Sequence, residues 1–204
     1  MDVFRPLINS HWAFRLFLAL PAIAMLWRFG LMAGGTGQLL SASGEWAARL
    51  LIVTLAVTPL RMLFHQFGLA QHLPMWLFKR RRDLGLAAFL YAALHLATYV
   101  ARQSNLHLIL YEMRYIEYIM GWIAITSMLI IAVISNDWSV HHLGTKWKLL
   151  QRLVYVSAVA AFLHWLWIKL DDVPVLVHFA PLAALEAFRL WYNFARPAGP
   201  RHPS

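Results

Sequence analysis

The chain has 204 residues, of which 61% are hydrophobic, and a formal net charge of +9. This apolar content is too high for an ordinary soluble domain, and the apolar residues fall in blocks about as long as a bilayer is thick. The sequence has no cysteine, which excludes disulfides, thiolate metal sites, iron–sulfur clusters and cysteine nucleophiles. The basic residues flank the apolar blocks and therefore indicate membrane topology, so no nucleic-acid partner is expected.

These blocks predict an all-α, polytopic membrane protein with six transmembrane helices. In chain order, the predicted spans cover residues 12–32, 47–64, 84–101, 118–135, 149–168 and 173–192. The first block is followed by further spans, so we expect it to be retained rather than cleaved as a signal peptide. We assign residues 1–195 to one six-helix domain and residues 196–204 to a short polar cytoplasmic tail. The sequence has no Walker loop or Rossmann fingerprint, so a nucleotide-binding domain is not expected.

The distribution of Lys and Arg predicts the orientation of the bundle in the membrane. It places both termini in the cytoplasm of a multi-pass protein of the bacterial inner membrane. The basic run KRRR (79–82) and most of the other cations then lie on the inner side. The cations left on the outer side are Arg28, Arg49, Arg102, Arg114 and Lys169.

Two of the ten histidines lie deep inside predicted spans. His95 lies in YAALHLATYVA (91–101), and His164 lies in AFLHWLWI (161–168). Measured from the outer ends of their spans, both lie ~9–12 Å below the periplasmic surface. His178, near the outer end of the sixth span, is a third candidate for the same pocket or a quinone site, or is an ordinary interfacial histidine.

Two histidines at one depth, with no intramembrane carboxylate beside them, favour a heme iron with one imidazole on each face of the ring. Two other uses stay open, namely hydrogen bonding between helices and a proton relay. Arg49 and Arg102 lie in the layer where heme propionates would need partners, although both also suit ordinary snorkelling at helix ends.

Three stretches carry a resemblance to a known family: WAARLLIVTLAVTPL (46–60), RRDLGLAAFLYAALHLATY (81–99) and HHLGTKWKLLQRLVYVSAVAAFLHWLW (141–167). With the six-span layout, they resemble the MsrQ family (formerly YedZ), which belongs to the ferric-reductase-like transmembrane superfamily. Its members are heme-binding membrane subunits of the bacterial periplasmic methionine sulfoxide reductase system. The most specific parts are RRxLGL followed by LHL, and LGxxWxxLxxxVY followed by the second histidine.

The resemblance implies heme b and flavin mononucleotide (FMN) as cofactors. It also implies electron transfer from the quinone pool or a cytosolic flavin reductase to a periplasmic, molybdopterin-containing subunit that reduces methionine sulfoxide in oxidised proteins. His95 and His164 match heme ligands of the family. Gln151 stands where a family member has another proposed histidine ligand, and glutamine is not a usual heme ligand, so we expect one heme.

The resemblance locates neither the flavin nor the catalytic chemistry in this chain. A flavin phosphate would suit the cations Arg81, Arg82, His141 and Lys146, although a positive-inside loop explains these charges equally well. We expect no catalytic residue here, since the substrate-reducing site would lie on the partner, which would dock on outer loops at residues 34–46 and 102–115. Two alternatives are a stand-alone heme-dependent transmembrane reductase and a histidine-relay proton channel or transporter without heme.

Overall fold

The computed structural model describes residues 10–30, 35–169 and 172–195. Throughout these ranges the chain forms helices and no strand, which confirms the predicted all-α class. The elements are α2 (His11–Met25), the π-helical turn η1 (Leu26–Gly30), α3 (Thr36–Gln66), α4 (His72–Lys79), α5 (Arg81–Gln103), α6 (Leu106–Glu112), α7 (Ile116–Ile134), α8 (Asp137–Leu143), α9 (Thr145–Gln151), α10 (Leu153–Lys169) and α11 (Asp172–Ala195).

Six segments are long and apolar enough to cross a membrane, as the sequence predicts. They are His11–Gly30, Thr36–Gln66, Arg81–Gln103, Ile116–Ile134, Thr145–Lys169 and Val173–Ala195. The protein is therefore a multi-pass membrane protein. The tail assigned to residues 196–204 lies outside the described residues.

The second span differs most from its predicted bounds of 47–64, because α3 has 31 residues and begins at Thr36. Its length of ~46 Å exceeds the ~30 Å of a bilayer core. The expectation of a loop at 34–46 is thus wrong from Thr36 onward, and the expected loop at 102–115 contains α6. Within this part of the helix, the Ser43 hydroxyl donates to Leu39 O at 2.7 Å.

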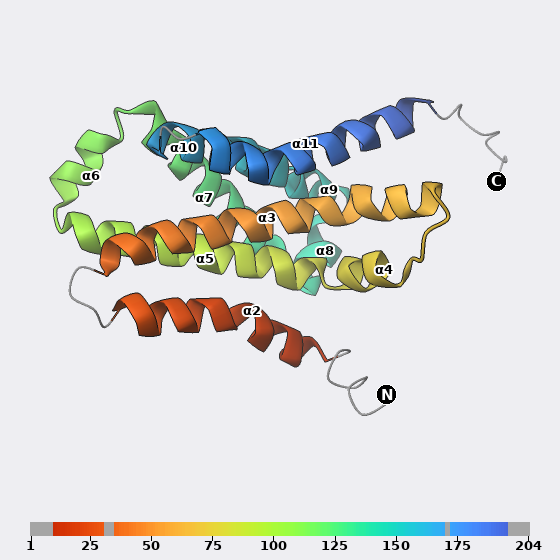
Figure 1. Ribbon diagram of the computed structural model, residues 1–204, viewed down its shortest axis with the longest axis horizontal. Coiled ribbons are helices and arrows are strands. Elements are labelled where there is room, and N and C mark those ends of the chain that lie inside the picture. The colour runs from red at the N-terminus through yellow and green to blue at the C-terminus, as the bar shows by residue number, and fades with distance from the viewer. Residues whose placement is uncertain (1–9, 31–34, 170–171, 196–204) are drawn as a thin grey trace.

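Figure 1 shows α3 and α5 side by side in the middle of the bundle and along its long axis. A second closely packed pair is α7 and α10, while α11 lies against α3 and α2 lies along the opposite edge. The start of α2, the end of α11 and helix α4 lie at one end of the bundle, which we call the α4 end. Helix α6 lies at the other end, the α6 end.

Helix α2 is the most peripheral span and faces outward along most of its length. Trp12 and Trp27 are 72% and 77% exposed, as expected for side chains that contact lipid.

Two polar contacts attach α2 to α5. Buried Asp83 accepts hydrogen bonds from Arg15 Nε at 2.7 Å and from His11 Nδ1 at 2.9 Å. The Tyr91 hydroxyl donates to Leu18 O and accepts from the Ala22 N–H, both at 2.8 Å. These two backbone groups lie on either side of Pro21, which is inside α2.

The predicted orientation can be tested with single cysteines, because the natural chain has none. We expect His107→Cys, on α6, to react with a membrane-impermeant maleimide in intact spheroplasts. We expect Thr145→Cys, at the start of α9, to react only after the membrane is opened. Both side chains are exposed, so their accessibility to the maleimide differs only by the side of the membrane on which they lie. The reverse labelling pattern would place the termini outside, and the unsubstituted chain is the blank.

Candidate functional site

His95 of α5 and His164 of α10 face each other across a cavity near the middle of the bundle. The centroids of the two imidazole rings are 6.2 Å apart, and the ring planes are inclined at 84°. The cavity has a volume of about 270 Å³ and is lined by α3, α5, α7 and α10. Its wall is mostly apolar and includes Leu51, Ile125 and Met128. The structure therefore brings together the two histidines that stood out in the sequence.

Each imidazole is fixed by a hydrogen bond to a backbone carbonyl of a neighbouring helix. The Nδ1 atom of His95 lies 2.8 Å from Leu40 O of α3, and Nδ1 of His164 lies 2.7 Å from Glu117 O of α7. Because a carbonyl oxygen only accepts, Nδ1 carries the hydrogen on both rings. The neutral ring then presents its lone pair on Nε2, as it does in metal-binding histidines whose other nitrogen donates to a carbonyl.

Two glycines make these hydrogen bonds possible. A Cβ atom on Gly44 would lie 2.8 Å from Nδ1 of His95, and one on Gly121 would lie 2.9 Å from Nδ1 of His164. Each glycine follows the accepting carbonyl by four residues, so its missing side chain would cover that carbonyl on the same helix face. The same arrangement of glycine, carbonyl and histidine thus occurs twice, once between α3 and α5 and once between α7 and α10.

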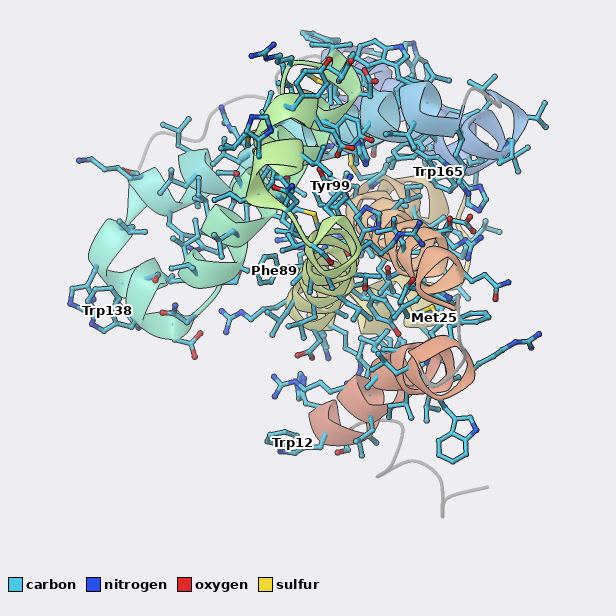
Figure 2. All side chains as sticks on the ribbon, turned by 90° about the vertical axis from the view of Figure 1, so that its left-hand side faces the viewer. Trp12, Met25, Phe89, Tyr99, Trp138 and Trp165 are labelled. Atoms are coloured by element: carbon cyan, nitrogen blue, oxygen red, sulfur yellow. The ribbon has the colours of Figure 1, made fainter. Side chains whose placement is uncertain are left out.

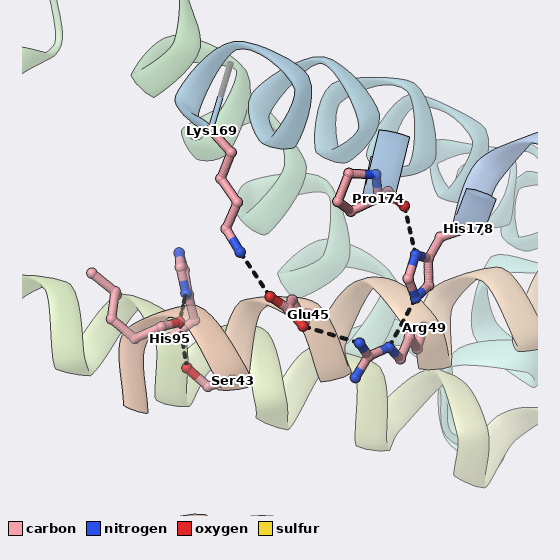
Figure 3. A network of polar contacts seen from close by, with 8 residues as sticks. Ser43, Glu45, Arg49, His95, Lys169, Pro174 and His178 are labelled. Carbon is pink, nitrogen blue, oxygen red and sulfur yellow. Dashed lines mark hydrogen bonds and ion pairs between the residues drawn. The ribbon is translucent and has the colours of Figure 1, made fainter. Parts of the chain in front are cut away.

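Charged side chains line one side of the cavity (Figure 3). Glu45 and Lys169 both line the cavity, and their carboxylate and ammonium groups are 2.7 Å apart. The other carboxylate oxygen of Glu45 lies 3.0 Å from Arg49 Nη2. Arg49 Nε donates to Nε2 of His178 at 3.1 Å, and Nδ1 of His178 donates to Pro174 O at 2.6 Å.

The α6 helix is tied to the cavity wall by a second polar group. The hydroxyl of Tyr99, which lines the cavity, donates to one carboxylate oxygen of Glu112 at 2.5 Å. Gln103 Nε2 donates to the other oxygen at 2.6 Å. Tyr99 also packs beside Tyr118 of α7, with ring centroids 6.0 Å apart. Figure 2, seen from the α6 end, shows Tyr99 near the middle of the helices. Helix α6 is therefore connected to the cavity wall through Glu112.

The structure places the remaining candidates away from the cavity lining. Arg49 does not line the cavity but donates to Glu45, which does. Arg102 does not line the cavity either, and its Nη1 donates to Thr36 Oγ1 at 3.5 Å. The four cations considered for a flavin phosphate lie at the α4 end in α5, α8 and α9. They are Arg81, Arg82, His141 and Lys146. Of these, Arg82 pairs with Asp137 of α8 at 2.8 Å.

Sequence reasoning missed Gly44, Gly121 and the charged pair Glu45–Lys169. The glycines had a signal, since an isolated glycine inside an apolar helix pattern indicates close approach of another group. The charged pair joins residues 124 positions apart and had no local signal. Among the described residues, no group of three or more His, Cys, Asp or Glu could hold a metal ion.

Comparisons with known proteins agree with this architecture. Residues 43–162 match the family model described as ferric reductase like transmembrane component. A protein of Rhizobium meliloti (strain 1021) is 37% identical over 192 residues, which cover 88% of this chain and 82% of that protein. Proteins of Brucella ovis and Brucella abortus (strain S19) are each 32% identical over 203 residues, covering 94% of this chain and 87% of theirs. All three are named protein-methionine-sulfoxide reductase heme-binding subunit MsrQ. No solved structure matches the chain significantly.

The two glycine positions predict a specific cost of adding one methyl group. Gly44→Ala and Gly121→Ala should each destabilise the protein by roughly 1–3 kcal/mol, because the facing imidazole must move and weaken its bond to the carbonyl. The measurement is the thermal unfolding midpoint in detergent.

Gly85→Ala on α5 is the matched control, since its Cβ would meet only Thr54 Cγ2 at an ordinary 3.6 Å. This control should be neutral or gain about 0.5–1 kcal/mol from the loss of glycine in a helix. Equal midpoints for Gly44→Ala, Gly121→Ala and Gly85→Ala would show that the histidines do not need the space.

Proposed function

We infer the function from the premise that the chain belongs to the family of ferric reductase like transmembrane components. We propose that it is a heme b-containing electron-transfer subunit of the bacterial inner membrane. Its electrons would serve a periplasmic, molybdopterin-containing methionine sulfoxide reductase that repairs oxidised proteins. Support comes from relatives named as heme-binding subunits of protein-methionine-sulfoxide reductase. The observation that carries the proposal is the imidazole pair His95–His164 across one cavity.

The residues of the cavity fit a heme. Two neutral imidazoles from different helices supply the donor set of a six-coordinate heme iron, which needs no further protein ligand. The two imidazole rings, with centroids 6.2 Å apart across the cavity, would both reach an iron held between them. The mostly apolar wall suits the macrocycle. His95 and His164 would be the axial ligands.

In this proposal the chain binds, orients and tunes the heme. A bound heme supplies one-electron chemistry by alternating between its ferric and ferrous forms. The carbonyls of Leu40 and Glu117 hold each imidazole in the tautomer that presents Nε2 and increase its basicity as a ligand. With both imidazoles bound to it, the heme would have no open position for oxygen. The apolar wall excludes water, which keeps protons and side reactions away from the transferred electron.

Electrons would enter at the α4 end and leave at the α6 end. The donor would be the quinone pool or a cytosolic flavin reductase, and an FMN phosphate would contact Arg81, Arg82, His141 or Lys146 at the basic α4 end. One heme is proposed, since Gln151 cannot replace an imidazole, and its amide donates to Ser135 Oγ at 3.4 Å. No catalytic residue for sulfoxide reduction is assigned to this chain.

The test is a reduced-minus-oxidised absorption spectrum of the purified protein with heme quantified per chain. We expect a low-spin, b-type signal at a stoichiometry of one, and its loss in both His95→Ala and His164→Ala, because each variant removes one axial ligand. His107→Ala, on the exposed face of α6, is the control and should keep the signal.

Three results would contradict parts of this proposal. An unchanged spectrum and stoichiometry in either ligand variant would exclude the His95–His164 assignment. Two hemes per chain would contradict the interpretation of Gln151. A purified chain without a Soret band would instead support a histidine relay without heme.

A further inference from the structure

The cavity has a charged corner within an otherwise apolar wall. Glu45 of α3 and Lys169 at the end of α10 both line the cavity, and their side chains form an ion pair of 2.7 Å. Both groups are only partly exposed. In a membrane protein, charged side chains that line a cavity are candidates for a functional site.

This corner has more positive than negative charge. Glu45 accepts from Lys169 and from Arg49, so a single carboxylate faces two cations. His178 does not change this balance, because its Nδ1 donates to Pro174 O and its Nε2 accepts from Arg49 Nε, which makes the ring neutral. A partly buried corner with an excess cation favours a second anionic group.

A buried donor lies beside the same corner. Trp165 lines the cavity and is 8% exposed, and its indole N–H is buried without a hydrogen-bond partner in the described part of the chain. Lys169 Nζ lies 5.9 Å from the centroid of this ring. A buried N–H without an acceptor costs free energy, so an acceptor group bound here would be stabilised by Trp165 as well as by Lys169.

We propose that Lys169 holds a carboxylate arm of the ligand bound between His95 and His164, with Glu45 as its exchangeable counter-ion. The inference rests on the proposed function, because the carboxylate belongs to a propionate of the heme. Arg49, whose Nε donates to His178, stays paired with Glu45 when Lys169 binds the propionate. Lys169 thereby takes the role that the sequence suggested for Arg49 and Arg102, neither of which lines the cavity.

This assignment predicts that removing the charge of Lys169 and removing the charge of Glu45 shift the midpoint potential of the heme in opposite directions. A positive charge beside the heme favours the reduced form, and a negative charge favours the oxidised form. Lys169→Gln should therefore lower the midpoint potential of the heme, whereas Glu45→Gln should raise it. Opposite shifts would show that both charges lie beside the heme, and the contact between Lys169 and the carboxylate is tested separately by blocking that carboxylate.

The decisive experiment compares iron protoporphyrin IX with its dimethyl ester, in which both carboxylates are blocked. Each is titrated into the purified, heme-depleted full chain in detergent, and the dissociation constant is read from the Soret band. The natural chain should bind the acid about tenfold more tightly than the ester, the value of one partly exposed charge-assisted contact. Lys169→Gln should remove most of this difference, and Lys169→Arg should retain it.

Lys148→Gln is the matched control, since it removes the same charge from exposed α9 at the α4 end. It should preserve both the acid–ester difference and the midpoint potential. An unchanged acid–ester difference in Lys169→Gln, or shifts of the same sign in Lys169→Gln and Glu45→Gln, would overturn the assignment. If the natural chain binds neither porphyrin, the proposed function itself fails. Should Lys169→Gln not fold, the acid–ester difference of Glu45→Gln decides, because releasing Lys169 from its counter-ion should widen that difference, and a narrower difference would overturn the assignment.

Discussion

The interaction on which the rest of the site depends is the hydrogen bond from an imidazole Nδ1 to a helix carbonyl. A histidine in a lipid-spanning helix needs a polar partner inside the protein, since hydrocarbon offers none. The carbonyl of a regular helix is normally covered by the side chain one turn later, and Gly44 and Gly121 remove that cover. The position of each glycine thus sets the axial register in which α5 packs on α3 and α10 packs on α7.

The cavity follows from using this interaction twice. Because His95 and His164 are each held from behind by a carbonyl, both rings extend from their own helix toward the space between the two pairs. A ring fixed in one tautomer and one orientation loses little further entropy when Nε2 binds a metal. Each helix pair therefore holds one imidazole in place, and the cavity between the pairs has a mostly apolar wall.

The sequence predicted what depends on single spans and missed what depends on pairs of spans. Six apolar blocks and a histidine within an apolar block are local patterns, so the fold class and the positions of His95 and His164 could be found. Glu45 and Lys169 meet only because α3 and α10 pack together, and nothing near either residue indicates the other. The start of α3 was missed for a different reason, since serine hydroxyls that bond to their own helix look the same in sequence as loop serines.

The location of the histidine pair also constrains how an electron reaches it. Helix α5 begins at Arg81, fourteen residues before His95, so ~21 Å of apolar helix separates the basic α4 end from the pair. Gln151 has no imidazole to hold a second iron in this interval. In the proposed function, with one heme, a second carrier would bind within the α4 half of the bundle or enter it from the lipid. A soluble donor that stays at the membrane surface satisfies neither condition unless it first reduces such a carrier.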